Sequence, residues 1–280
     1  MSARLRGRIA ELKRRLFEID PRPDLTYRSR LMRRGGTFQE RLQWDVFDRP
    51  QYAYALYQAA REAHALGVPE ITAVELGVAS GAGLLALERI AKEVFRETNV
   101  EIRVVGFDGG GGMPPPEDNR DLPWLWQTGH FDIDVEGLRS RLTSAELILG
   151  DVSQTVPAFL ERARLAPIGF IAFDLDYYSS TRAAMPLLTD RSETILPRAF
   201  CYFDDVVGND YELHSDYAGE LLAIRDFNAE QPHRKLSLIN GLPGKRQIPA
   251  IWTYQMYVLH AFDHPRYDEY LALGEEQLPL

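Results

Sequence analysis

The sequence has 280 residues, of which 45% are hydrophobic and 26% are charged. This composition is ordinary for a soluble globular protein with a full core, and it excludes a disordered or fibrous chain. The net charge is −9, but residues 1–34 hold eleven Lys/Arg against four Asp/Glu, so the remainder carries −16. An acidic body disfavours nucleic acid as a partner, because a nucleic-acid groove needs a basic face.

Residues 1–48 are interpreted as an N-terminal extension. A basic helix is predicted at 1–19, where apolar residues recur at three- and four-residue spacing, and residues 24–48 are predicted to be irregular. Residues 1–20 carry charges throughout, and no stretch reaches the roughly 18 apolar residues of a membrane span. We therefore expect a cytoplasmic protein without a membrane partner. We expect the basic arm either to pack between subunits or to form a solvated helix, in preference to contact with RNA or an anionic membrane, and we expect a homo-oligomer.

Residues 49–280 are predicted to form one α/β domain. Strands are predicted at Ile71–Leu76, Ile102–Phe107, Glu146–Leu149, Ile168–Leu175 and Phe200–Phe203, with a closing hairpin of Lys235–Ile239 and Ile251–His260. Helices are predicted at Arg49–Leu66, Gly83–Phe95, Val135–Leu142, Thr155–Arg164, Ser180–Leu188 and Tyr217–Asn228. This alternation indicates a doubly wound, mostly parallel Rossmann-like sheet that ends in an antiparallel hairpin. The single cysteine, Cys201, is predicted to be a buried core thiol.

A glycine-rich turn follows the first predicted strand and opens a helix. It runs Glu75-Leu76-Gly77-Val78-Ala79-Ser80-Gly81-Ala82-Gly83. Glycines let the chain turn sharply and let a ligand approach the main chain. The spacing Gly-x-x-x-Gly-x-Gly differs from the dinucleotide pattern Gly-x-Gly-x-x-Gly, although short-chain NAD(P)-dependent oxidoreductases share it. Those enzymes carry a Tyr-x-x-x-Lys pair, which this sequence lacks.

Acidic residues end the next two predicted strands. Asp108 ends the second strand, where a carboxylate can accept both ribose hydroxyls of a nucleoside cofactor. Asp151 ends the third strand, and it either faces the same ligand or caps the helix that follows. Ligands of doubly wound sheets bind beyond the carboxyl ends of the strands. The glycine turn and these two acids therefore predict one nucleoside site.

Four carboxylates follow the fourth and fifth predicted strands. Asp174 and Asp176 end the fourth, on one face if the strand continues that far, and Asp204 and Asp205 follow the fifth. Neighbouring parallel strands bring all four to one edge of the sheet. Close anions cannot all stay ionised without a cation. Because oxygen ligands favour hard ions, the cluster predicts Mg²⁺ or another hard divalent cation.

These segments together resemble a known family. The pattern Asp-x-Asp-x-Tyr-x-Ser-Thr-Arg at 174–182, followed by Asp-Asp at 204–205, is similar to the metal-dependent O-methyltransferases that act on sugars of macrolide and aminocoumarin antibiotics. These are class I S-adenosylmethionine-dependent methyltransferases, and Glu75 before the first glycine also looks like their form of the turn. The resemblance covers about residues 70–210. Four consecutive glycines at 109–112 and the stretch 124–130 depart from the family pattern.

The resemblance implies a cofactor, a metal and a base. S-adenosylmethionine would be bound by Glu75, Gly77, Ser80, Gly81, Gly83, Asp108, Asp151, Val152 and Asp174. Mg²⁺ would be held by Asp174, Asp204 and Asp205. Asp176 would be the general base, with His130 as a second catalytic candidate and His214 as a further one.

The expected acceptor is a hydroxyl of a sugar or another natural-product small molecule. The loop 109–131 is long enough for a lid, in which Trp124, Trp126 and Phe131 either cover the acceptor or anchor the loop. Two alternatives are a short-chain oxidoreductase and a non-catalytic protein that keeps the fold. A metal-dependent hydrolase would leave the glycine turn and Asp108 unexplained.

Overall fold

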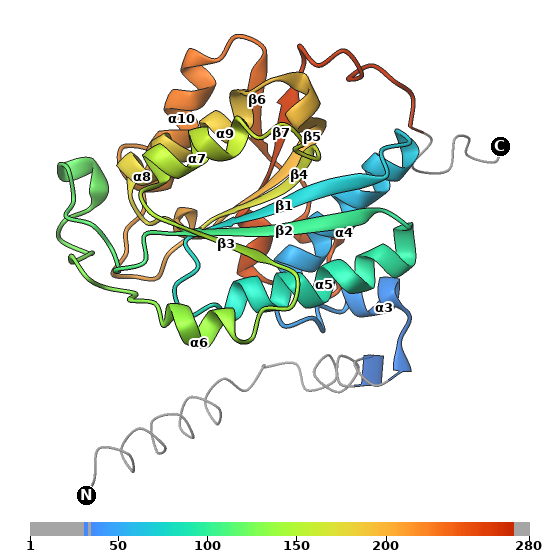
Figure 1. Cartoon of the computed structure of the whole chain (residues 1–280), viewed down its shortest axis with the longest axis horizontal. Helices are drawn as coiled ribbons and strands as arrows, with labels where there is room; N and C mark the ends of the chain where they lie inside the picture. The colour runs from blue at the N-terminus through green and yellow to red at the C-terminus, as the bar shows by residue number, and fades with distance from the viewer. Residues whose placement is uncertain (1–30, 33–34, 272–280) are drawn as a thin grey trace, which may run out of the picture. The chain divides into compact units, whose positions relative to one another are not determined.

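A computed structural model of the chain describes residues 31–32 and 35–271 (Figure 1). The predicted helix at 1–19 lies outside these residues. The described residues divide into two units, one comprising those up to Phe47 with Arg246–Ile248, the other comprising Asp48–Lys245 and residues 249–271. Within the described ranges, every helix is too short or too polar to cross a membrane.

The smaller unit contains a short helix that was not predicted from the sequence. Helix α3 spans Phe38–Gln43 and begins with a capping box. The Thr37 N–H donates to Glu40 Oε2 (2.8 Å), and the Glu40 N–H donates to Thr37 Oγ1 (3.3 Å). The expectation of an irregular 24–48 segment is therefore wrong at this helix. Its Thr-x-x-Glu spacing is the local signal for a helix start.

The larger unit is built on a seven-stranded sheet. Its strands are β1 (Glu70–Leu76), β2 (Glu101–Asp108), β3 (Glu146–Leu149), β4 (Ile168–Phe173), β5 (Ile195–Phe203), β6 (Arg234–Leu238) and β7 (Met256–Ala261). Their order across the sheet is β3-β2-β1-β4-β5-β7-β6. Strands β1 to β5 are parallel, whereas β7 runs antiparallel to β5 and β6. The predicted mostly parallel sheet with a closing hairpin is confirmed.

Helices cover both faces of the sheet. Helices α4 (Pro50–Ala65) and α5 (Ala82–Thr98) pack on one face, and the other face carries α7 (Val152–Leu160), α8 (Tyr178–Ala184), α9 (Pro186–Thr189) and α10 (Gly219–Glu230) (Figure 1). The short helix α6 (Val135–Arg139) precedes β3. The 3-10 helices are η1 (Asn119–Asp121), η2 (Ser192–Thr194), η3 (Asp204–Val206), η4 (Pro243–Lys245) and η5 (Ile251–Tyr254). This two-sided cover confirms the doubly wound class.

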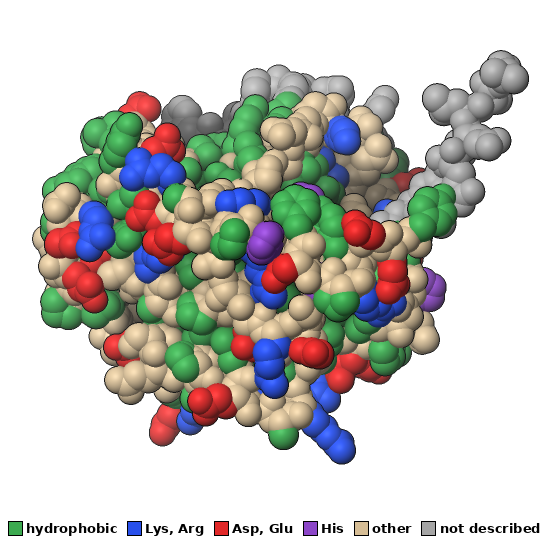
Figure 2. Space-filling view, turned by 90° about the horizontal axis from the view of Figure 1, so that it is seen from above, with side chains coloured by type: hydrophobic (Ala, Val, Ile, Leu, Met, Phe, Trp, Pro, Cys, Tyr) green, Lys and Arg blue, Asp and Glu red, His purple; other side chains and the backbone are tan. Residues whose placement is uncertain are grey.

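The outer surface of the α7–α10 layer is mixed in character. Figure 2 shows this side from above, with acidic and basic side chains interspersed among apolar and neutral ones. An ion pair between Arg182 and Glu230 (2.6 Å) links α8 to α10. Exposed pairs of this kind contribute little to stability.

Aromatic packing beneath the sheet edge fixes the strand ends that carry acids. Phe173 and Phe203, the last residues of β4 and β5, are fully buried and stack with their ring centroids 4.4 Å apart. Asp174 and Asp204 follow them directly, so the core determines where these carboxylates begin. Cys201 is also fully buried, and burial raises the pKa of its thiol. The prediction of a core thiol is confirmed.

Strand β4 ends at Phe173, two residues earlier than predicted. The Leu175 N–H donates to Glu220 Oε1 of α10 (3.4 Å). Asp176 then takes a φ of +60°, a left-handed conformation that non-glycine residues adopt rarely. Asp176 is therefore presented on a turn and not on a face of the strand. The predicted helix 180–188 is likewise split into α8 and α9, at Pro186.

Candidate active site

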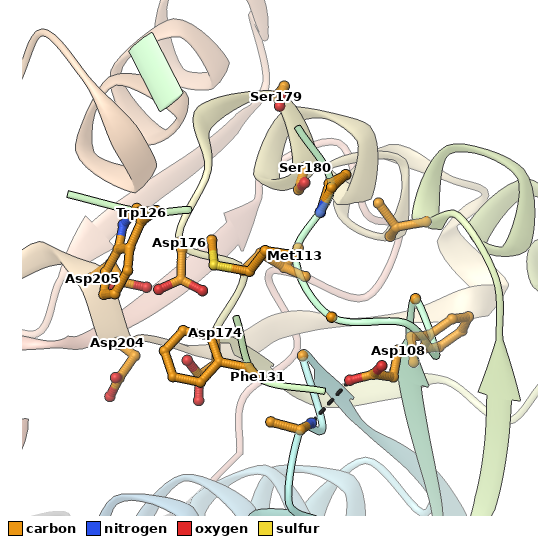
Figure 3. Close-up of a pocket in the computed structure, with 18 of the residues that line it drawn as sticks. Asp108, Met113, Trp126, Phe131, Asp174, Asp176, Ser179, Ser180, Asp204 and Asp205 are labelled. Atoms are coloured by element: carbon orange, nitrogen blue, oxygen red, sulfur yellow. Dashed lines mark hydrogen bonds between the residues drawn. The ribbon is translucent and has the colours of Figure 1, made fainter. Parts of the chain in front are cut away.

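A cavity of about 780 Å³ lies at the carboxyl ends of β1 to β5, within the larger unit. This edge is where ligands of doubly wound sheets bind. Figure 3 shows Asp108 on one side of the cavity and four further acids on the other. The predicted site residues that line it are Gly77, Asp108, Asp151, Val152, Asp174, Asp176, Asp204, Asp205 and His214.

The glycine turn is tight because of neighbours within the protein. Gly77 has a φ of +85°, and a Cβ there would lie 1.8 Å from the carbonyl oxygen of Asp174. A Cβ on Gly83 would lie 1.8 Å from Glu75 Oε1, and one on Gly81 would clash with a leucine of α6. Of these glycines only Gly77 lines the cavity. Gly81 and Gly83, predicted to contact the cofactor, instead let the turn pack against the chain.

Two other predicted cofactor residues lie off the cavity wall. Glu75 is only 2% exposed, and its Oε1 accepts a hydrogen bond from Tyr52 Oη at 2.8 Å. Its Oε2 is buried without a partner. Burial raises the pKa of Glu75 to about 7, although the Tyr52 hydrogen bond and the charge of Arg49 act against this rise. Ser80 is exposed and does not line the cavity.

Asp108 holds the turn in place while facing the cavity. Its Oδ2 accepts from the N–H groups of Val78 (3.0 Å) and Ala79 (2.9 Å), and its Oδ1 accepts from that of Gly110 (2.8 Å). A dashed line in Figure 3 marks a hydrogen bond of Asp108 to the turn. Ala79 has a φ of +43°, so these bonds stabilise a left-handed residue. A carboxylate has about four acceptor positions, so Oδ1 keeps one for a ligand hydroxyl.

Asp151 combines the two roles considered for it. Its Oδ1 accepts from the Ser153 N–H (2.8 Å), which makes it the N-cap of α7. Helix α7 therefore begins at Val152, three residues before the predicted start. Both Asp151 and Val152 still line the cavity beside β3. The helix N-terminus thus faces the same space as Asp108.

The acids after β4 and β5 strongly influence one another. Burial raises the pKa of Asp174 well above its ordinary value, and the charges of Asp204 and Asp176 raise it further. Burial and neighbouring acids raise the pKa of Asp176 to about 7. The pKa of Asp205 is also raised well above its ordinary value, by burial first and then by Asp176. The carboxylates of Asp176 and Asp205 point toward each other in Figure 3. Such a group stays fully ionised only with a compensating cation.

Two residues not predicted from the sequence hold this cluster. Glu220 of α10 is fully buried, and its Oε2 accepts from the Asp205 N–H (3.1 Å) while its Oε1 accepts from that of Leu175. One side chain thus joins the ends of β4 and β5. Gln255 donates from Nε2 to the carbonyl oxygen of Asp204 (2.6 Å). Both residues are distant in sequence from the acids they position.

The predicted metal ligands match a hard cation in chemistry. Asp174, Asp204 and Asp205 offer oxygen donors only, and Asp205 Oδ2 is buried without a hydrogen-bond partner. Among residues 31–32 and 35–271, however, no three His, Cys, Asp or Glu side chains are grouped closely enough to hold a metal. The donor set fits Mg²⁺, while the side chains would have to converge to bind it.

The two candidate histidines differ in position. His130 is exposed, does not line the cavity and packs near Phe131, with ring centroids 6.1 Å apart. The structure therefore does not bring His130 to the acids, contrary to its predicted catalytic role. The His214 side chain is 5% exposed and lines the cavity, with Nε2 3.8 Å from Glu212. Burial lowers the pKa of His214, which favours the neutral ring.

The predicted lid is anchored at its middle. Asp121, in η1, accepts from the Ser179 N–H and hydroxyl at 2.8 Å each, and from the Glu117 N–H at 2.8 Å. It is 1% exposed. The loop 109–131 is therefore not structureless. A buried carboxylate attaches it to the start of α8, next to the acidic cluster.

The lid aromatics divide into two kinds. Trp126 and Phe131 line the cavity together with Met113, and the two rings lie 5.8 Å apart (Figure 3). Trp126 Nε1 is buried without an acceptor, so a ligand oxygen can take its hydrogen bond. Trp124 is 59% exposed and does not line the cavity.

The strand order defines the fold. A mostly parallel sheet in which an antiparallel β7 lies between β5 and β6 is the Rossmann-like fold of class I methyltransferases. Among solved structures, calicheamicin methyltransferase CalS11 is similar to this chain, with a TM-score of 0.53 and 22% identity over 87% of this chain and 93% of that chain. The likeness establishes the fold.

Two further matches to solved structures are weaker. An apo structure of CalS11, described as a TDP-rhamnose 3′-O-methyltransferase, gives a TM-score of 0.45 and 21% identity over 87% of this chain and 95% of that chain. The O-methyltransferase TomG from Streptomyces achromogenes, solved with S-adenosylmethionine, gives a TM-score of 0.41 and 16% identity over 92% of this chain and 98% of that chain. Neither a protein-family model nor a curated protein sequence matches the chain.

Proposed function

We propose that the chain is an S-adenosylmethionine-dependent O-methyltransferase that uses a divalent cation such as Mg²⁺. The acceptor is a hydroxyl of a sugar or another natural-product small molecule. The observation that carries the proposal is the division of one cavity into two halves. Asp108 and Asp151 line the half at β2 and β3, and the acids after β4 and β5 line the other.

The first half suits a nucleoside. Asp108 keeps an acceptor position for a ribose hydroxyl, and Asp151 and Val152 form the adjoining wall. The backbone turns sharply at Gly77, which has a positive φ and lies between this half and the acids. A donor that spans the cavity from β3 to β4 would present its reactive group to the acidic half. Bound S-adenosylmethionine would supply an activated methyl group there.

The second half suits activation of a hydroxyl. Asp174, Asp204 and Asp205 would hold the cation, which on binding lowers the pKa of a neighbouring hydroxyl. Asp176 takes the proton as the O–C bond forms and the C–S bond breaks. Its left-handed backbone aims the carboxylate at the cavity. Trp126 and Phe131 exclude water from the reacting atoms.

The residues that line the cavity in the described part of the chain disfavour the oxidoreductase alternative. The cavity lining in the described part of the chain includes neither a tyrosine nor a lysine, and short-chain oxidoreductases need both. NADH titration followed by fluorescence distinguishes the two functions. Binding of NADH in the micromolar range without binding of S-adenosylhomocysteine would refute the methyltransferase proposal.

The main test separates cofactor binding from metal use. By calorimetry, the full chain should bind S-adenosylhomocysteine at low micromolar concentration or tighter. Asp204→Asn should keep this affinity within about threefold but abolish Mg²⁺ binding and EDTA-sensitive methyl transfer to a panel of glycosides and phenols. Asp210→Asn, an exposed change nearby, is the matched control. Activity that survives both Asp204→Asn and EDTA would show that the metal assignment is wrong.

A further inference from the structure

One cationic side chain in the cavity has no role in the proposed chemistry. Arg49 is the only lysine or arginine that lines the cavity in the described part of the chain. Its guanidinium lies over the Tyr52 ring, 5.6 Å from the centroid. Within residues 31–32 and 35–271 it has no hydrogen bond or ion pair. A half-buried arginine therefore keeps its donors available to a ligand.

Arg49 is also held close to acids that do not pair with it. Burial lowers the pKa of Arg49, but Tyr52, Glu75 and Asp174 together raise it above its ordinary value, so the guanidinium remains protonated. Tyr52, one turn into the same helix, donates to Glu75 at the end of β1. This bond fixes the start of α4 against the glycine turn. Arg49 consequently lies on the cavity wall near the ends of β1 and β4, beside Glu75 and Asp174.

We propose that Arg49 binds the α-carboxylate of the amino-acid part of S-adenosylmethionine. This inference rests on the proposed function. The carboxylate is the cofactor's only anionic group, and a guanidinium binds a carboxylate through two parallel hydrogen bonds. With the nucleoside at Asp108 and Asp151, the amino-acid part falls at the β1 turn, where Arg49 lies.

An anionic acceptor is the competing occupant of Arg49. It would have to lie in the half of the cavity that also exposes Asp176, Asp204, Asp205 and Glu212. Those acids repel an anion, and Arg49 supplies one positive charge against them. The amino-acid part of the cofactor carries its own ammonium group beside the carboxylate, which reduces this repulsion.

The test compares two ligands that differ by one group. S-adenosylhomocysteine carries the carboxylate, whereas 5′-(3-aminopropylthio)-5′-deoxyadenosine keeps the nucleoside, sulfur and amine but lacks it. By calorimetry, the full-length wild-type chain should prefer S-adenosylhomocysteine by about 10- to 100-fold. Arg49→Gln should reduce that preference to below about threefold by weakening only the carboxylate-bearing ligand. The preference of Arg49→Lys should fall between those of the wild type and Arg49→Gln, because the lysine ammonium lacks the planar pair of donors.

The control is Arg225→Gln. Arg225 also lies over a tyrosine ring, that of Tyr217, at 5.0 Å, but does not line the cavity. Its variant should keep the full preference. The ratio of two affinities within one variant does not depend on the folded fraction. If Arg49→Gln weakened the affinity for both ligands equally, or if the wild type showed no preference between them, the role of Arg49 would be refuted while the proposed function would stand. Failure of the wild type to bind S-adenosylhomocysteine would overturn the proposed function.

Discussion

The burial of Glu75 predicts a pH-dependent gain in stability when its charge is removed. The carboxyl is 2% exposed, and one oxygen has no partner. Its pKa is about 7 in the folded chain, against 4.5 for an ordinary glutamate. That difference corresponds to about 3 kcal/mol. Glu75→Gln keeps the acceptor for Tyr52 Oη and removes the ionisation.

The sign of this pH dependence follows from the number of protons that the folded and unfolded chains bind. Between pH 4.5 and 7 the folded chain keeps the Glu75 proton while the unfolded chain has lost it. Wild-type stability therefore falls as the pH rises through this range, and the Gln variant lacks this loss. The free energy of unfolding of Glu75→Gln relative to wild type should rise by about 3 kcal/mol from pH 4.5 to 8. A buried, unpaired amide adds a cost of about 1–3 kcal/mol that does not vary with pH.

Urea denaturation at several pH values, without cofactor, measures this difference. The slope with pH is the readout, because the other buried acids titrate in both proteins. Glu136→Gln, at an exposed position, controls for the change in net charge. A difference between Glu75→Gln and wild type that stays constant within 1 kcal/mol from pH 5 to 8 would refute the reasoning.

Two further predictions concern the turn and the base. Gly77→Ala places a methyl 1.8 Å from a backbone oxygen at a φ of +85°, so unfolding free energy should fall by about 2–5 kcal/mol in urea denaturation. Gly244→Ala, with open space around it, should change it by less than about 0.5 kcal/mol. Asp176→Asn should lower kcat by about 10²–10⁴-fold, whereas His130→Gln, off the cavity wall, should change it less than about threefold. Equal losses of kcat in those two variants would contradict the assignment of the base.

Much of the sheet could be predicted from local patterns. Buried parallel strands such as Ile168–Phe173 are continuous apolar runs, and the glycines after β1 mark the first crossover. Chain order alone then places acids at successive strand ends, since parallel strands share one carboxyl edge. The acids at or just after the ends of β2 to β5 are found on the cavity wall for this reason.

The residues that were not predicted reach the site through tertiary packing. Arg49 and Tyr52 come from a helix whose docking against β1 has no local signature, and Glu220 contacts Asp205 across 15 positions. The left-handed conformation of Asp176 depends on neighbours that sequence spacing does not reveal. His130 shows the opposite case. A histidine in a long loop gives no indication of which way its ring will point.

The position of β7 determines which half of the site can form first as the chain is synthesised. Strand β7 lies between β5 and β6, and Gln255 just before it bonds to both Asp204 and the Phe203 N–H. During synthesis, the nucleoside half needs only the chain to about β3, whereas the acidic half needs residue 255 and beyond. A nascent chain shorter than this leaves β5 as an open edge that invites pairing with other chains. Strand β7 thus both completes the second half of the cavity and covers the edge of β5.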